Sequence, residues 1–397
     1  MTQQESLQTS RFRRASGWIL FGLLQLALLS SLATATVWRD SQWKESVALP
    51  SLRTQPRKIV PRYDRPEVVS DEQLQSVLLK LRPRLAGPKP KINHVDHALR
   101  FWGIESEFSD PACLDGQQIR SLLLNHEQFI QAWGASTRPF LMVTRRGVEV
   151  RTREGDATAS HTDHTLAGLV EVGTPMSYPV HTSLGAATLA QMVNASLASF
   201  SLNQGEYEWT TLVQALCLEK LSGWTTSEGQ RIDFDRLSER LMRERLKQGV
   251  CFGNHRLFTL AALLQIDEQE QMLSTNTRNE IIEHLKNVTA TLVRHQHTYG
   301  YWDGNWTSRT AESGEALKET SNRILATGHA LEWWAIAPVD VQPPRETLVR
   351  AGQWLSSTIN GLDDAAVRQN YTYLTHAGRA LALWRGKTPM QAISERN

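Results

Sequence analysis

Residues 327–334, TGHALEWW, place a histidine and a carboxylate where they can act together. His329 and Glu332 are three residues apart, so on a helix they share one face. A neutral histidine beside a carboxylate can act as a general base near neutral pH. Trp333 follows at once and offers a flat apolar surface that suits a sugar ring. The segment therefore predicts an acid–base centre, or alternatively a hydrogen-bonded histidine within an aromatic core.

Two further segments repeat this arrangement, in which a polar turn and a histidine precede an apolar run. They are GNHRLFTLAALL, which contains His255, and THAGRALALW, which contains His376. A purely structural repeat would more simply use alanine or leucine at these positions, so three histidines in matching places favour a shared site. We therefore predict that His329, Glu332, His255 and His376 are catalytic, with core packing as the alternative.

Aromatic and acidic side chains near these segments are the candidates for substrate binding. Trp302 and Trp306 precede His329 along the chain, and Glu208 with Trp209 opens another apolar helix. Aromatic residues of this kind line many ligand pockets. For Glu208 the alternative interpretation is a capped, solvated first turn. The tryptophans, together with Trp333, have the alternative role of core residues.

Two histidine pairs have spacings that a metal ion could use, namely His94-x-x-His97 and His161-x-Asp163-His164. Neither pair forms the His-Glu-x-x-His motif, and the second follows a turn-rich segment. None of the three cysteines belongs to a CxxC pair, so a cysteine–zinc site is not expected. We therefore predict no metal and no cofactor, and assign these histidines to capping and turns.

The segment Gln296-His-Thr-Tyr-Gly300-Tyr-Trp302 resembles the QW motif of terpenoid cyclases and related prenyltransferase toroids. In those families the motif is structural and ties an outer helix to the following turn. The resemblance implies an α/α toroid. The sequence contains neither the Asp-x-Asp-Asp acid of the cyclases nor the Asp-x-Cys and histidine set that holds the zinc of the prenyltransferases. A shared fold is therefore expected without the shared catalysis.

The segment Gly328-His329-x-x-Glu332-Trp resembles a motif of the N-acylglucosamine 2-epimerase family, whose members are α/α toroids that act on sugars. That resemblance implies a proton-transfer role for His329 and a place in the sugar site for Glu332. THAGRAL is similar to the His-x-x-Arg-x-Leu segment of the same family. By that similarity His376 belongs to the site and Arg379 becomes a substrate-binding candidate. The two histidines lie closer together in this sequence than the helical hairpins of that family require.

A basic cluster near the N-terminus precedes an uncharged run at residues 15–38. About 20 apolar residues span a bilayer, and basic residues before such a run stay in the cytoplasm. We predict a cytoplasmic tail at residues 1–14 and a transmembrane anchor at 15–38. The main domain is then extracytoplasmic, in the periplasm or at the cell surface. A cleaved signal peptide with a site at Ala33-Thr34-Ala35 is the alternative.

The rest of the chain divides by composition into two parts. Residues 39–91 carry several prolines and arginines and little periodicity, which predicts a stalk with one short amphipathic helix. From residue 92 to 390, apolar helices alternate with amphipathic ones, apart from an expected β-hairpin near 138–156. Everything after residue 182 is helical in pattern. This alternation suits a barrel whose inner helices are buried and whose outer helices are half solvated, with an α-solenoid as the alternative.

The predicted fold class is thus mainly α, an α/α toroid with a small β-hairpin insertion and one N-terminal transmembrane helix. The 43 basic and 41 acidic residues give a net charge of +2, so charge offers no case for nucleic acid. We predict a carbohydrate-active enzyme of the epimerase, lyase or hydrolase type that binds a saccharide. One alternative is a non-catalytic toroid that binds a glycan, lipid or protein partner at the membrane. The other is an isoprenoid-handling enzyme of the terpenoid-cyclase type.

Overall fold

The computed structural model describes residues 18–38, 49–226, 228–307 and 316–394. The chain divides into two units, Met1–Ala48 and Leu49–Asn397, which are described separately. The predicted cytoplasmic tail, residues 1–14, lies outside the described residues. The prediction of a mainly helical chain with an apolar N-terminal helix is confirmed.

The first unit contains one described helix, Trp18–Trp38, which has 21 residues and no charged side chain. Its hydroxyl groups bond to the helix backbone, as Ser31 Oγ does to the carbonyl of Ala27 at 2.8 Å and Thr34 Oγ1 to that of Ser30 at 2.7 Å. A bilayer offers no water to satisfy polar groups, so such internal bonds suit a membrane span. By length and composition the helix can cross a membrane, although a signal sequence meets the same criteria.

The second unit begins at Leu49, well before the predicted domain boundary at residue 92. The guanidinium of Arg57 is buried and donates to the backbone carbonyls of Ala215 at 3.1 Å and Leu218 at 2.5 Å. Helix α2 (Asp71–Lys80) also packs against the rest of the unit. The segment 49–70 forms no regular helix or strand, because its backbone bonds to the ends of distant helices. It therefore shows no hydrophobic period and resembles a linker in sequence.

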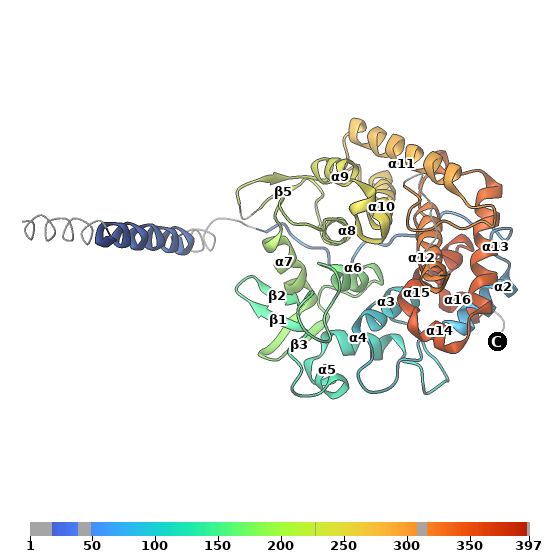
Figure 1. The fold of residues 1–397 in the computed structure, drawn as a ribbon, viewed down its shortest axis with the longest axis horizontal. Helices are drawn as coiled ribbons and strands as arrows, with labels where there is room; N and C mark the ends of the chain where they lie inside the picture. Colours follow the sequence, from blue (N-terminus) through green and yellow to red (C-terminus); the bar gives the residue numbers. More distant parts are fainter. Residues whose placement is uncertain (1–17, 39–48, 227, 308–315, 395–397) are drawn as a thin grey trace, which may run out of the picture. The chain divides into compact units, whose positions relative to one another are not determined.

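Six helices form the centre of the second unit, and each contacts the next in the series (Figure 1). They are α3 (Ile92–Trp102), α6 (His164–Glu171), α8 (Glu208–Cys217), α10 (Asn254–Glu270), α12 (Ala316–Trp334) and α15 (Tyr371–Trp384). The last helix, α15, also contacts the first, α3. Every residue of α8 is buried, as is α10 from its first residue through Asp267. Burial on all sides explains why these helices lack a polar face in sequence.

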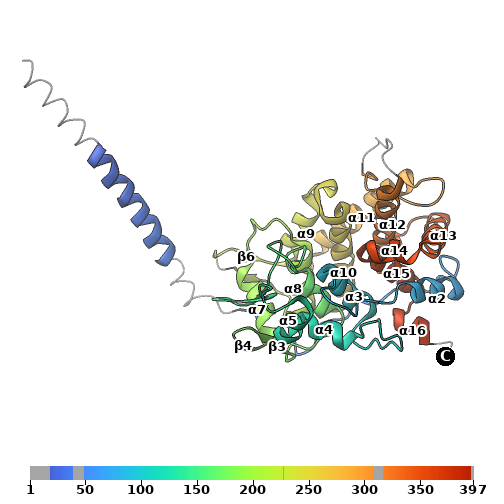
Figure 2. The same ribbon diagram turned by 60° about the horizontal axis from the view of Figure 1, so that its bottom comes forward.

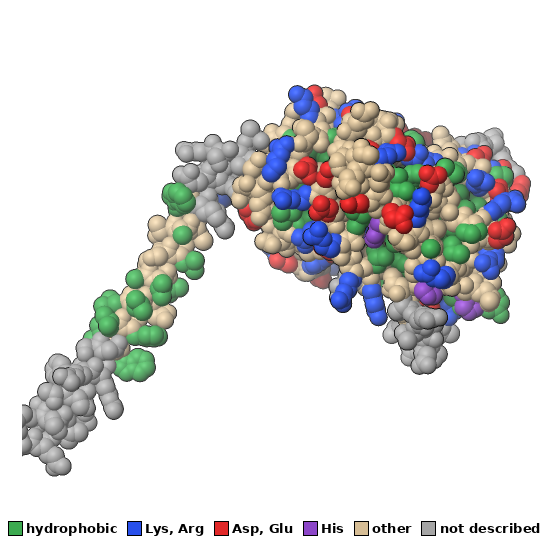
Figure 3. Space-filling model, turned by 90° about the horizontal axis from the view of Figure 1, so that it is seen from above, with side chains coloured by type: hydrophobic (Ala, Val, Ile, Leu, Met, Phe, Trp, Pro, Cys, Tyr) green, Lys and Arg blue, Asp and Glu red, His purple; other side chains and the backbone are tan. Residues whose placement is uncertain are grey.

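Further helices lie around this series (Figure 2). They are α4 (Gly116–Leu124), α5 (His126–Trp133), α7 (Leu189–Ser199), α9 (Phe234–Arg243), α11 (Thr275–His295), α13 (Arg345–Gly361), α14 (Asp364–Gln369) and α16 (Pro389–Ser394). In α9, for example, Leu237 and Leu241 are buried, whereas Arg236 and Glu239 are exposed. On the face shown in Figure 3, basic and acidic side chains are interspersed, without a broad patch of one sign.

Three short antiparallel hairpins complete the described structure, and the first lies within the predicted range 138–156. They are β1 (Leu141–Thr144) with β2 (Gly147–Val150), β3 (Pro179–Thr182) with β4 (Gly185–Thr188), and β5 (Trp224–Thr225) with β6 (Arg231–Ile232). In the first hairpin Leu141 pairs with Val150. Strands β4, β5 and β6 differ from the expectation of helix after residue 182, because strands of two to four residues are too short to show a period of two.

The turn after α11 is held by the side chain of Gln296. Its Nε2 donates to the carbonyls of Gly300 and of Thr347, both at 2.9 Å. Thr347 belongs to α13, so the amide joins the end of α11 to the next outer helix. In the same turn, Trp302 Nε1 donates back to the carbonyl of Leu292 in α11 at 2.7 Å. The segment therefore connects one outer helix to the next turn and helix.

Candidate functional site

Five of the central helices direct one histidine each to a common region of the interior. These residues, here called the histidine cluster, are His97, His164, His255, His329 and His376, on α3, α6, α10, α12 and α15. All are between 1% and 5% exposed. The ring centroids of His329 and His376 are 3.9 Å apart, and those of His255 and His329 are 4.8 Å apart. The three predicted catalytic histidines are thus neighbours in space.

His376 forms a dyad with Glu332. Its Nδ1 lies 3.1 Å from the carboxylate Oε2 of Glu332. Its Nε2 is buried and has no hydrogen-bond partner among the described residues. A histidine that donates Nδ1–H to a carboxylate carries a lone pair on Nε2, which is the arrangement of a general base with its orienting acceptor. His329 and Glu332 share a face of α12 as their spacing predicts, but Glu332 has its partner on another helix.

Two arginines hold Glu332 from the other side. Arg100 donates to Oε1 of Glu332 at 2.7 Å and to Oε2 of Glu171 at 2.7 Å. Arg379 also bonds to both glutamates. Burial alone would raise the pKa of Glu332, but the charges of Arg100 and Arg379 outweigh it and hold this pKa well below its usual range. Glu332 therefore remains a carboxylate. It can accept a hydrogen bond from His376 and orient that ring, but it cannot act as a proton donor.

His329 and His255 form a second pair, with their Nε2 atoms 2.8 Å apart. His329 Nδ1 lies 2.8 Å from the carbonyl of Leu325, so it carries the proton that this bond needs. Its Nε2 is then an acceptor, and His255 must donate from its own Nε2. Burial, followed by the charge of the neighbouring histidine, lowers the pKa of both rings well below the ordinary value. Both imidazoles are therefore neutral at neutral pH.

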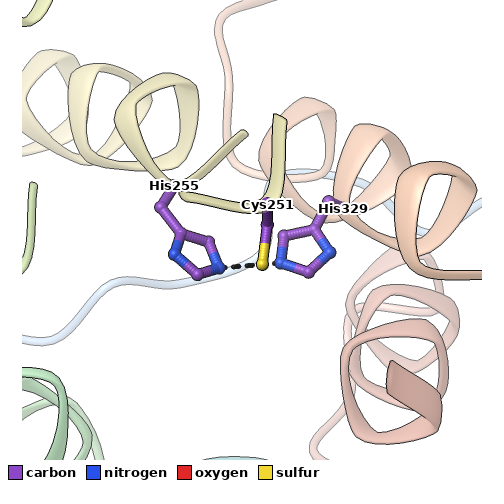
Figure 4. Close-up of side chains that lie close together, drawn as sticks. All are labelled: Cys251, His255 and His329. Carbon is purple, nitrogen blue, oxygen red and sulfur yellow. Dashed lines mark hydrogen bonds between the residues drawn. The ribbon is translucent and has the colours of Figure 1, made fainter. Parts of the chain in front are cut away.

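The thiol of Cys251 points toward this pair of rings (Figure 4). Its sulfur and one nitrogen from each of His255 and His329 all lie within 4.8 Å of one another. Burial raises the pKa of the Cys251 thiol to about 12, so the sulfur is protonated in this state. A cysteine thus joins two of the predicted catalytic histidines.

Of the predicted substrate-binding residues, Arg379 and Trp209 lie at the site. Arg379 belongs to the ion-pair network described above. The Trp209 ring stands 4.5 Å from His255 and 4.7 Å from His164, measured between ring centroids. Glu208, the residue before it, is fully buried, and its Oε2 accepts the backbone N–H of Tyr207 at 2.9 Å. This contact makes Glu208 part of the start of α8 and not a solvated first turn.

The other predicted tryptophans belong to the apolar core. Trp302, Trp306 and Trp333 are 1%, 3% and 0% exposed. Trp302 and Trp333 pack against Trp334, with ring centroids 5.7 and 5.0 Å apart. Their ring faces are covered by neighbouring side chains. The structure therefore does not bring these three residues to the site as open aromatic walls.

Each of the two histidine pairs that the sequence analysis singled out for their spacing contributes one ring to the cluster, and the His161 ring also lies near it, 6.2 Å from that of His164 between ring centroids. His97 joins the cluster, whereas His94 packs against Tyr371. His164 joins the cluster, and its Nδ1 bonds to Asp96 at 2.7 Å. His161 instead meets the carboxylate of Glu206.

A cleft of about 620 Å³ reaches the ion-pair network from outside. Its lining includes the charged groups of Arg100, Glu171 and Arg379 and the apolar side chains of Phe101 and Leu383. Arg100 and Arg379 also border a narrow space beside His376. Arg100 and Arg379 therefore lie between the cleft and the His376–Glu332 dyad.

Sequence reasoning missed several of the residues at this centre. Arg100 and Glu171 are charged residues within mainly apolar helices, and such a charge signals a buried partner. Cys251 precedes His255 by four residues at the start of the same apolar run, but a cysteine–histidine spacing alone is common. These residues come together only because helices that are far apart in the chain pack against one another.

A comparison with known proteins found no matching family model, no matching curated protein and no matching solved structure.

Proposed function

We propose that this protein is a membrane-tethered α/α-toroid enzyme that transfers a proton on a carbohydrate substrate. The observation that carries the proposal is the His376–Glu332 dyad, which combines an ionised carboxylate with a buried, unpartnered Nε2 among the described residues. An apolar interior accepts such groups at a cost, since each unpaired buried polar atom costs about 1–3 kcal/mol. A catalytic role gives a reason for that cost.

The toroid part of the proposal is supported by the central helices. Helices α3, α6, α8, α10, α12 and α15 contact one another in series, and α15 returns to α3. Central helices that are buried over much of their length, with amphipathic helices outside them, suit an α/α barrel. The bonds of Gln296 to two neighbouring segments match the role that the QW resemblance implies. The Trp18–Trp38 helix supports the membrane tether, with the catalytic unit outside the cytoplasm.

In the proposed reaction His376 acts as the base. Its Nε2 takes a proton from the substrate, and the resulting imidazolium is stabilised by Glu332 through Nδ1–H. The same nitrogen, or the neighbouring pair of His329 and His255, then returns a proton to the substrate. Arg379, at the border of the cleft, offers positive charge to an oxygen that becomes negative during the reaction. The substrate enters from the cleft, which requires Arg379 to swing aside.

A non-catalytic binding module is the second candidate, because burial of the histidine cluster is also what a polar structural core would show. Such a module would bind its ligand in the cleft without using the dyad. An isoprenoid-handling enzyme has less support, since the described centre is rich in charges and histidines.

The test is a thermal-shift screen of the full chain with mono- and oligosaccharides and uronates, followed by proton exchange between bound substrate and deuterated solvent. A bound ligand raises the melting temperature by mass action. We expect His376→Gln to keep the fold and the thermal shift but to lose about 10²–10⁴-fold in exchange rate. The matched control is His284→Gln, on the outer helix α11.

Binding without exchange in the wild type would favour the non-catalytic module. If no saccharide shifts the folded wild type, the carbohydrate proposal is wrong.

A further inference from the structure

We propose that Cys251, His255 and His329 form a binding site for one transition-metal ion of the zinc class. A thiolate and two imidazoles are ligands that zinc accepts in proteins. The site extends beyond the proposed proton transfer, because it needs neither His376 nor a substrate. The sequence analysis predicted no metal because the sequence has no His-Glu-x-x-His motif and no CxxC pair. These three ligands instead come from two separate segments, and His255 and His329 are 74 residues apart.

The distances among the ligand atoms suit a single ion. The Cys251 sulfur and the two ring nitrogens lie within 4.8 Å of one another, and the two Nε2 atoms are 2.8 Å apart. Zinc–nitrogen bonds of about 2.0–2.1 Å in a tetrahedron hold two nitrogens about 3.3 Å apart. The rings therefore have to separate by only about 0.5 Å to admit an ion. That shift is within the reach of side-chain rotation.

The hydrogen bond behind His329 sets the ring for metal binding. Its Nδ1–H donates to the carbonyl of Leu325 at 2.8 Å, which leaves the lone pair of Nε2 facing Cys251 and His255. Metal-bound histidines nearly always donate their second nitrogen in this way, which fixes the tautomer and the ring orientation. On binding, the ion takes the place of the proton between the two rings, and His255 changes tautomer, so that its single proton moves from Nε2 to Nδ1. The thiol proton leaves to solvent.

The backbone before α10 takes an unusual form that aims the thiol at the rings. Cys251 and Phe252 lie in the short helix η2 (Val250–Gly253) and both have left-handed backbone angles, with φ of 49° and 60°. Non-glycine residues with positive φ are uncommon, and each costs about 1–3 kcal/mol at sites that retain them. The Phe252 ring packs over Gly304, where an added Cβ would lie 2.5 Å from it. A core cysteine needs no such turn.

Three protein ligands leave one of four tetrahedral positions for water or another group, as in catalytic rather than structural zinc sites. The ring of His376 stands 3.9 Å from that of His329, on the side of the Glu332 dyad. A metal-bound water at the fourth position would thus have a base close by. This relation rests on the proposed function, whereas metal binding itself does not.

The experiment is a titration of the full chain, in detergent and reducing agent, with Co²⁺ and Zn²⁺ after treatment with a chelator. Cobalt bound through a thiolate gives a sulfur-to-metal charge-transfer band, which reports the cysteine directly. We expect one metal ion per chain with that band, and Zn²⁺ should displace the cobalt. Cys251→Ser should abolish the band, and His329→Gln should weaken binding by at least about tenfold. Cys217→Ala, which removes a different buried thiol, should change neither.

Absence of the band in the folded wild-type chain would overturn the proposal, and so would unchanged affinity in both ligand variants. The wild-type spectrum decides the matter even where a variant fails to fold. The readout uses no substrate, so metal binding and proton transfer are judged separately. A chain that binds metal without exchange activity refutes the proposed function alone, and an active chain without metal refutes this site alone.

Discussion

Glu332 receives its role from three side chains on two other helices. Arg100 and Arg379 neutralise its charge, and His376 uses its second oxygen. In isolation, a glutamate three residues after a histidine is a candidate acid or base. Within this network it is a fixed anion, because separating it from both arginines in a buried place would cost several kcal/mol. His376, and not Glu332, is therefore the group expected to exchange a proton with the substrate.

We predict that Glu332→Gln destabilises the protein by about 3–5 kcal/mol, because Arg100 and Arg379 then share Glu171 alone and one buried positive charge is left uncompensated. Equilibrium urea unfolding measures this free energy. Glu67→Gln is the control, since it breaks an exposed pair with Arg345 and should cost about 0–1 kcal/mol. Equal effects of the two variants would contradict the assignment of Glu332 to a buried network.

The same prediction has a pH dependence. The pKa of Glu332 is lower in the folded state than its ordinary value of 4.5. The stabilisation by its charge is therefore complete above about pH 4.5 and is lost as the pH falls from there toward the folded-state pKa. The difference in unfolding free energy between wild type and Glu332→Gln should be constant from pH 7 to about 5 and shrink below that.

At the scale of elements, the turn between α11 and α12 depends on close backbone approach. Gly300 has a φ of 103°, and a Cβ there would lie 2.4 Å from the carbonyl oxygen of Arg350 in α13. The bonds of Gln296 hold the same turn against that helix. The turn therefore fixes how the outer helices meet, and it also leads toward α12, which carries His329 and Glu332.

We predict that Gly300→Ala destabilises the protein by about 2–5 kcal/mol, from the positive φ together with the clash. Gly361→Ala at the end of α13 is the matched control, because a Cβ there meets nothing within 4 Å. That variant should be neutral or stabilising by up to about 1 kcal/mol. Thermal unfolding of both variants provides the comparison. A tolerant Gly300 would show that the turn can shift away from α13.

At the scale of the whole molecule, the chain consists of two units that differ in how far their apolar side chains are buried. The side chains of the Trp18–Trp38 helix are almost all exposed and most are apolar, and none of its apolar window is buried. The unit from Leu49 onward has its own core, to which the Pro- and Arg-containing segment 49–70 contributes Val68 and Val69. The first unit is thus suited to a membrane and the second to folding by itself.

We predict that removal of residues 1–48 moves the protein from the membrane fraction to the soluble fraction without changing its melting temperature. Alkaline extraction of membranes and thermal unfolding test the two parts of this expectation. Mass spectrometry of the full-length protein provides the check on the anchor. A mature N-terminus near Ala35 would show that the segment is a cleaved signal and not an anchor.

Features that depend only on neighbouring residues can be predicted from the amino-acid sequence. The uncharged run at 15–38, the alternation of apolar and amphipathic helices and the histidines at or near the starts of apolar runs can all be read locally, because hydrophobic period and helix signals extend over one or a few turns. The hairpin near 138–156 can also be predicted from the sequence. The segment 49–91 cannot, since its bonds go to distant helices.

Which side chains contact one another depends on how the helices pack in three dimensions. Arg100 lies 232 residues from Glu332, and His376 lies 44 residues from it. The same packing buried Trp302 and Trp333 and brought Cys251 beside two histidines. Side-chain spacing in the chain carries no information on such contacts, because they are set by how whole helices bury their apolar surfaces against one another.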